Sequence, residues 1–442
     1  MFRRFGRRRR GRAVSLLAPD NPVMYDEDDP NTWYPNEPIP ELRAHERHLM
    51  MPDEARRVEK ELRDHFRENE TWRTEKILGG GSQSNRLVLV SRRNPRSGRY
   101  QRLAVKRAMT NKAEEELRTE ILHLGRQVNA QHIATMIAAR DDPVPEEVTV
   151  EVLTNKFQQL LKKATPRRRR LYKLNDPRRV GKELGLKSFV GWPVLVLEYL
   201  EHGTLYQLIM RANQNGVVFP NRMLWHIYLC LLRACLALAY PAPAGQPPAV
   251  DITGAPKIQL ETITKEPDQA TLWDRSLNIF KVMLGSTGGK WPEHDLVPVS
   301  KIIDLGAAIE DQRGLAENLY SITHIMYCLI TRETNPNFVS GPTESVWTRG
   351  SAIIPTEHND PYPHIDIDLR TIVAKGLAVM PEERPALPNV AHGVWRGFNK
   401  PVEAYAFPQQ IHENDMSIKV FVHNLIFDAD ISTTDPANPA VI

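Results

Sequence analysis

An aspartate followed by a leucine and a glycine, Asp304 to Gly306, stands directly behind the apolar run 299–303. The run predicts a buried strand, and the glycine allows the backbone to turn sharply after it. The carboxylate of Asp304 would then lie at a strand end, where it suits a divalent metal ion bound to nucleotide phosphates. An Asp-x-Gly turn is also common without any function. The meaning of Asp304 therefore depends on what lies upstream.

A run of three glycines, Gly79 to Gly81, lies between two strand-like segments. Because glycine has no side chain, the backbone N–H groups of such a run can approach phosphates closely. A strand rather than a helix follows the run, which argues against the dinucleotide-binding turn of a Rossmann fold. The run predicts either a phosphate-binding loop or an ordinary glycine hairpin.

Lys106 lies inside the apolar strand-like segment 103–107, where an unpaired ammonium group would be costly to bury. Glu120, in the helix-like segment that follows, is expected to be its partner. The acidic residues from Glu114 to Glu116 compete for that place, and only helix register favours Glu120. The alternative is a surface lysine on an edge strand.

These groups need strands and helices to position them, and the hydrophobic periodicity predicts such elements along most of the chain. The expected elements are a charged helix at 53–69, strands at 72–78, 87–90 and 103–107, a helix at 113–128, strands at 132–138 and 192–200, and helices at 223–240, 319–331, 367–380 and 387–398. Near the end, Ile418, Val420 and Val422 form a strand-like alternation.

The 442 residues, 41% hydrophobic and 25% charged, predict a soluble globular protein with a large core. The longest apolar stretch is interrupted by His226 and Arg233, so it predicts a buried helix and no membrane span. The three cysteines, Cys230, Cys235 and Cys328, lie in apolar runs without a pairing pattern. We expect them to be reduced core residues of an intracellular protein, cytoplasmic or nuclear, and neither zinc ligands nor disulfides.

The composition divides the chain into a main domain with flanking regions. Residues 1–50, basic and then acidic and proline-rich, are expected to be disordered, and 51–71 to form a charged helix. The domain would cover 72–398 with insertions at about 143–190 and 241–270, and no role is evident for the tail 399–442.

The basic residues form two clusters, Arg3 to Arg12 and Arg167 to Arg170. The first could be a nuclear-localisation or nucleic-acid patch, or a solvated tail. The second has no interleaved aromatic residues, and the net charge of +4 is small for this length. Nucleic-acid binding is therefore not expected.

The order of the predicted elements resembles the protein kinase fold over residues 72–398. Gly79 and Gly81 resemble the glycine-rich loop, and the segment with Ala104 and Lys106 resembles the strand that contacts ATP. Glu120 matches the glutamate of helix C, which orients that lysine.

Further motifs extend the resemblance through the chain. The segment with Glu198 and Leu200 resembles the hinge that meets adenine. Asn278 and Asp304 resemble the two residues that hold Mg²⁺, the catalytic-loop asparagine and the D-F-G aspartate. The resemblance is to the divergent kinase-like proteins of filamentous fungi. It implies a two-lobed α+β fold, with a small antiparallel sheet lobe and a mainly helical lobe, and ATP and Mg²⁺ as cofactors.

The catalytic loop departs from the family pattern. Trp273 stands where the family carries its catalytic aspartate, and Asp274 could act as the base only if the loop has lost one residue. Asn318 replaces the aspartate expected early in the helix that follows, and Arg384 is expected to lack its glutamate partner.

The resemblance thus leaves two functions open. One is a serine/threonine protein kinase with Asp274, Lys106 and Glu120 as catalytic residues and a protein as substrate. The other is an inactive pseudokinase that acts as a signalling or scaffold module through its partners.

Overall fold

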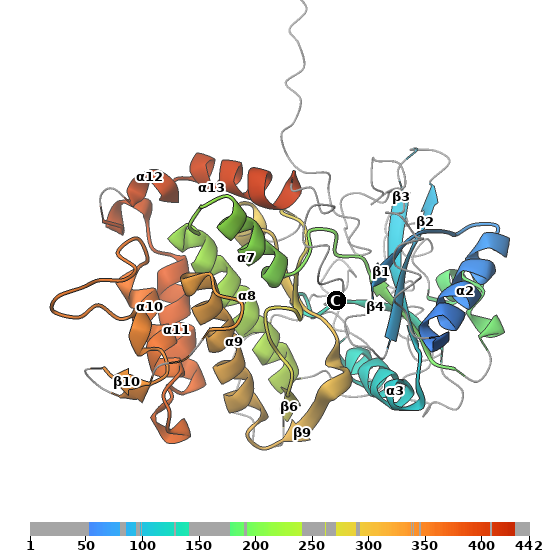
Figure 1. Cartoon of the computed structure of the whole chain (residues 1–442), viewed down its shortest axis with the longest axis horizontal. Coiled ribbons are helices and arrows are strands. Elements are labelled where there is room, and N and C mark those ends of the chain that lie inside the picture. Colours follow the sequence, from blue (N-terminus) through green and yellow to red (C-terminus); the bar gives the residue numbers. More distant parts are fainter. Residues whose placement is uncertain are drawn as a thin grey trace, which may run out of the picture.

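The computed structural model describes residues 53–79, 85–93, 98, 100–127, 130–140, 177–189, 192–240, 261, 271–288, 292–336, 338, 340–343, 346–406 and 409–428. A five-stranded antiparallel sheet, in the order β1-β2-β3-β5-β4, occupies one side of the molecule. Figure 1 shows this sheet at the right, with most of the helices gathered at the left. The chain is therefore an α+β protein.

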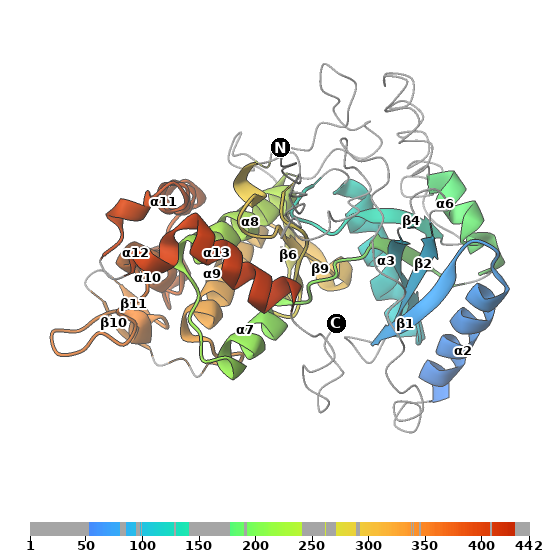
Figure 2. The same cartoon turned by 90° about the horizontal axis from the view of Figure 1, so that it is seen from above.

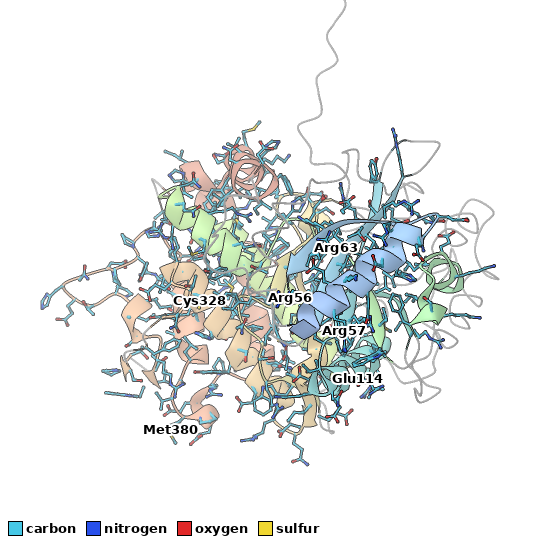
Figure 3. The ribbon with its side chains drawn as sticks, turned by 45° about the vertical axis from the view of Figure 1, so that its right-hand side comes forward. Arg56, Arg57, Arg63, Glu114, Cys328 and Met380 are labelled. Carbon is cyan, nitrogen blue, oxygen red and sulfur yellow. The ribbon has the colours of Figure 1, made fainter. Side chains whose placement is uncertain are left out.

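The sheet and the elements beside it come from the first part of the chain. They are α2 (Asp53–Glu68), β1 (Arg73–Gly79), β2 (Asn85–Arg93), β3 (Tyr100–Ala108), α3 (Asn111–Arg126), β4 (Met136–Arg140), α6 (Pro177–Glu183) and β5 (Val194–Glu198). Seen from above, α2 and α3 lie on opposite sides of the sheet (Figure 2). Figure 3 labels Arg56, Arg57 and Arg63 along α2.

The alternation of side chains along β3 explains this arrangement, because successive residues of a strand point to opposite faces. Leu103 and Val105 pack into a core cluster with Leu62 of α2. Ala104 belongs to a second cluster with Leu117 of α3, which continues into the helices. Lys106 shares the face of Ala104, so strand register directs it towards α3.

The helices at the left of Figure 1 bury the larger core. They are α7 (Leu205–Gln214), α8 (Asn221–Ala239), α9 (Gly314–Thr331), α10 (Ile367–Gly376), α11 (Leu387–Phe398), α12 (Gln410–Glu413) and α13 (Asp415–Val422). Helix α8 is long and apolar enough to cross a membrane, but 89% of its apolar window is buried inside the protein. Its apolarity is therefore explained by its place in the core.

Three short strand pairs accompany these helices. Strand β6 (Thr271–Asp274) pairs with β9 (Ala308–Asp311), β7 (Val282–Leu284) with β8 (Ser300–Ile302), and β10 (Gly341–Pro342) with β11 (Trp347–Thr348). Asp274 is the last residue of β6, Lys281 directly precedes β7, and Asp304 follows shortly after β8.

The predicted helices and strands are confirmed to within a few residues, with two corrections. The tail alternation is wrong as a strand: α13 buries Ile418 and Val422 and leaves Val420 half exposed, the four-residue spacing of a helix. The strand at 132–138 begins only at Met136, because the preceding segment turns to bridge Ile133 to Ile302.

The core also extends beyond the boundary expected at residue 398. Ile418, Val422, Leu425 and Ile426 all belong to the larger cluster. Part of the insertion expected at 143–190 is likewise packed, since Val180 and Leu184 join the cluster beside α2. The expected disordered region 1–50 lies outside the described residues. So do residues 143–176 and 190 of the first expected insertion and all of the second, 241–270, except Glu261.

Candidate functional site

Lys106 forms two ion pairs at the junction of the sheet and the helices. Its Nζ lies 2.7 Å from Oε2 of Glu120 and 2.7 Å from Oδ1 of Asp304. Burial opposes its charge, but the two carboxylates together raise the pKa of Lys106 above its ordinary value. The prediction that Glu120 is the partner of Lys106 is confirmed, and the edge-lysine alternative is wrong.

Local sequence explains how Glu120 reaches this place. The side chain of Thr110 accepts a hydrogen bond from the N–H of Ala113 and so caps α3. Glu120 then lies on the buried side of the helix with Leu117 and Ile121. The carboxylate is enclosed, with 1% of its side chain exposed.

Asp304 follows β8 in a left-handed backbone conformation, with φ of 62° and ψ of 71°. Non-glycine residues rarely adopt this conformation, and it costs on the order of 1–3 kcal/mol where the surrounding structure imposes it. Burial opposes ionisation, but the ammonium groups of Lys106 and Lys281 hold the pKa of Asp304 well below its usual range. This carboxylate is therefore ionised, and with 38% of the side chain exposed it remains accessible from solvent.

Asp274 closes β6 and has no exposed surface. Its Oδ1 accepts hydrogen bonds from the N–H and the hydroxyl of Ser276, and Nζ of Lys281 lies 3.2 Å away. Burial raises the pKa of Asp274, although Lys281 and Ser276 lower it. Its second oxygen is buried without a hydrogen-bond partner among the described residues.

Lys281 connects Asp274 to Asp304. Its Nζ donates to the backbone carbonyl of Asp304 at 2.7 Å and lies 3.7 Å from its Oδ2. The sequence argument missed this residue. The signal was present, because Lys281 stands between Phe280 and Val282 in an apolar segment, as Lys106 does in its own strand.

Asn318 of α9 holds the backbone beside Asp274. Its Oδ1 accepts from the N–H of Asp274 at 3.1 Å, and its Nδ2 donates to the carbonyl of Leu272 at 2.6 Å. Trp273 pairs with Ile309 in the ladder between β6 and β9. The residue beside Lys281 is Asp274, whose Oδ1 lies 3.2 Å from Nζ of Lys281.

Asn278, the other predicted metal ligand, has its side chain bound elsewhere. Its Oδ1 accepts from the N–H of Phe280 at 2.9 Å, which closes a local turn. Among the described residues the side chain of Asn278 makes no hydrogen bond to Asp304 or Lys281, although its backbone carbonyl accepts from the N–H of Lys281 at 3.0 Å. Only Asp304 of the predicted metal pair belongs to the ion-pair cluster.

The carboxylate of Glu198 is also engaged. Its Oε1 accepts from the N–H of Thr135 at 2.7 Å and from Nζ of Lys301 at 2.7 Å. The backbone N–H of Glu198 is also engaged, since it donates to the carbonyl of Thr135 at 3.0 Å. Leu200, the other predicted hinge residue, is buried beyond the end of β5. Ala104 faces Leu197 across the sheet.

The glycine run is described only in part. Gly79 ends β1, whereas Gly81 lies outside the described residues. The structure therefore leaves the choice between phosphate-binding loop and ordinary hairpin as the sequence left it.

Arg384 corrects one sequence expectation. Its Nη1 lies 3.8 Å from Oε2 of Glu317, and its guanidinium lies over the ring of Tyr320 at 4.1 Å. The expectation that Arg384 lacks a glutamate partner is wrong, because the partner comes from α9.

Comparison of the chain with protein-family models finds no match, and comparison with curated proteins finds none either. What the fold and the site themselves define is an α+β protein in which the buried Lys106 pairs with the carboxylates of Glu120 and Asp304.

Proposed function

We propose that this chain is a kinase-like protein that binds ATP with Mg²⁺ between its sheet and its helices, and that it transfers phosphate weakly or not at all. The ion pairs of Lys106 with Glu120 and Asp304 carry the proposal, because they join the three residues that the kinase resemblance assigns to nucleotide binding. The two-lobed kinase-like arrangement is part of this proposal.

The residues present fit the two cofactors. Mg²⁺ commonly uses one or two carboxylates together with phosphate oxygens and water. Asp304 supplies an ionised carboxylate that remains 38% exposed, whereas Glu120 is enclosed. Bound Mg²⁺ would neutralise phosphate charge, and the carboxylate of Asp304 would hold the ion. Lys106, kept in place by Glu120, would bind phosphate oxygens.

The state of Asp274 supports the pseudokinase over the active kinase. A general base must come within hydrogen-bond reach of the proton that it accepts. Asp274 has no exposed surface, and its Oδ1 is bound by Ser276 and Lys281. Loss of a general base typically costs about 10²–10⁴-fold in rate. The chain would then act through its conformation and a protein partner.

Thermal unfolding with and without Mg-ATP tests nucleotide binding. Ligand at 100 times its dissociation constant stabilises a protein by about 2.7 kcal/mol, which gives a clear rise in Tm. We expect this rise for the wild type and for Lys182→Met, a control at an exposed lysine of α6. Lys106→Met and Asp304→Asn should lose it. No rise in the wild type would refute the proposal.

Measurement of γ-phosphate transfer separates the two kinase-like functions. We expect wild-type transfer no greater than that of Asp274→Asn. Transfer that Asp274→Asn abolishes would instead establish an active kinase with a displaced base.

A further inference from the structure

A second cluster of polar side chains is buried away from Lys106. One ligand atom from each of His132, Cys230 and His294 lies within 4.8 Å of the others. The three residues are 1%, 2% and 3% exposed. They come from the segment before β4, from α8, and from the 3-10 helix η3 (Pro292–His294).

His294 is the member that ordinary packing does not explain. Both of its ring nitrogens are buried without a hydrogen-bond partner among the described residues. Its Nε2 lies 3.6 Å from Oε1 of Glu293, too far for a hydrogen bond, and that oxygen is bound by Arg233 at 2.8 Å. An unsatisfied buried polar group costs about 1–3 kcal/mol, so it calls for a bound partner.

His132 is oriented by a carboxylate. Its Nδ1 contacts Oε2 of Glu261, and its backbone N–H donates to the other oxygen of Glu261 at 3.2 Å. The Nε2 atom is the nitrogen left to face the cluster. Histidines that bind metals commonly hold a carboxylate on their second nitrogen in this way, because it fixes the ring and makes the ligand more basic.

The backbone around these side chains is also fixed. The carbonyl of His132 accepts from the N–H of Ile302 at 2.8 Å, and the carbonyl of His294 accepts from the N–H of Gly288 at 2.7 Å. Cys230 lies within the long core helix α8. The ligands are therefore held on three separate and well-connected pieces of the fold.

We propose that His132, Cys230 and His294 bind a zinc ion, with Glu261 positioning His132. Two imidazoles and a thiolate suit zinc, whereas Mg²⁺ and Ca²⁺ prefer oxygen ligands. Zinc–nitrogen distances of about 2.0–2.1 Å and a zinc–sulfur distance of about 2.3 Å put tetrahedral ligand atoms about 3.5 Å apart. The cluster must therefore contract slightly on binding, and the Cys230 thiol releases its proton to solvent.

Such an ion would connect distant parts of the chain. It would tie the segment that leads from α3 to β4 to helix α8 and to the loop before β8. It would also anchor Glu261, which lies 129 positions from His132 in the sequence. The expectation that no cysteine is a zinc ligand would then be wrong for Cys230 alone.

The test is metal binding by the full-length chain. After removal of metal with a chelator, the protein is titrated with Co²⁺, whose thiolate charge-transfer absorption reports a cysteine ligand, and then with Zn²⁺. We expect one equivalent of metal, a cobalt–thiolate band, and a rise in Tm with Zn²⁺. The band should persist in Cys235→Ser and Cys328→Ser, two buried cysteines outside the cluster; Figure 3 labels Cys328 on α9.

Cys230→Ser should remove the cobalt–thiolate band, and His294→Gln should weaken Zn²⁺ binding at least tenfold while leaving a folded protein. His294→Gln keeps the test decisive if Cys230→Ser fails to fold. Failure of the wild type to bind Co²⁺ or Zn²⁺ would overturn the proposal. Binding that neither variant weakens would overturn it equally. None of these outcomes depends on nucleotide binding.

Discussion

The ammonium group of Lys281 lies 3.2 Å from Oδ1 of Asp274, a carboxylate with no exposed surface. The same ammonium donates to the backbone carbonyl of Asp304. One lysine thus neutralises the candidate base and fixes the strained backbone of the candidate metal ligand. Nucleotide binding and the absence of base catalysis would then have a common structural origin.

Lys281→Met should be strongly destabilising, because it leaves Asp274 as a buried charge without a cation. Breaking one side of a buried ion pair typically costs about 3–5 kcal/mol. Urea unfolding measures the loss, with Lys419→Met at an exposed position of α13 as the control. Adding Asp274→Asn to Lys281→Met should restore part of the stability, and no recovery in this double variant would contradict the pairing.

The loss in Lys281→Met should also depend on pH. Burial already raises the pKa of Asp274, and removal of the ammonium raises it further. An acid whose pKa is higher in the folded state loses stability as pH rises above its unfolded value of about 3.9. The free energy of unfolding that Lys281→Met loses relative to the wild type should therefore be smaller at pH 5 than at pH 8.

Gly306→Ala should disturb the contact between the Asp304 turn and α3. A Cβ atom at this position would lie 2.9 Å from the backbone carbonyl oxygen of Glu116. Since a backbone atom cannot move aside cheaply, we expect a loss of about 1–3 kcal/mol and weaker Mg-ATP binding. Gly181→Ala in α6 is the matched control, because its nearest atom, Cδ1 of Leu186, lies at 3.7 Å. Equal effects of the two substitutions on stability would speak against this prediction.

His202 should make the protein less stable in acid. Burial, and secondly the charge of Arg211, lower the pKa of His202 to about 3, and its Nε2 has no hydrogen-bond partner within the part of the chain that the structure describes. A histidine whose pKa is lowered in the folded state contributes full stability above about pH 6.5 and loses it as pH falls. We expect about 2 kcal/mol to be lost at pH 5 from this group. In urea unfolding, the free energy of unfolding should fall less between pH 7 and pH 5 in His202→Gln than in the wild type. His412→Gln, at an exposed site, should behave as the wild type does.

Two substitutions in helix α13, Ile418→Ala and Val420→Ala, should differ sharply in how much they lower the stability of the protein. Ile418 is fully buried and Val420 is 50% exposed. Truncating a buried isoleucine to alanine costs about 2–5 kcal/mol, whereas a surface change is usually within about 0.5 kcal/mol. Chemical unfolding of the two variants gives the comparison. Similar losses for both would be inconsistent with α13 packing through one face.

The amino-acid sequence alone predicted most of the secondary structure and the central ion pair. An apolar strand around Lys106 required a partner for the ammonium group, and the helical register of α3 presented Glu120 as that partner. Asp304 was found because its strand and its glycine are local signals. These inferences succeeded because each depends on residues close together in the chain or on one buried charge.

Only the tertiary structure decided the long-range relationships. Lys281 reaches the backbone carbonyl of Asp304, 23 positions later in the chain, and Glu317 meets Arg384, 67 positions later. The tail folded as a helix because Ile418 and Val422 find the core that the earlier helices build. His132, Cys230 and His294 converge for the same reason. Contacts of this kind depend on how the elements pack, and a linear pattern does not contain that information.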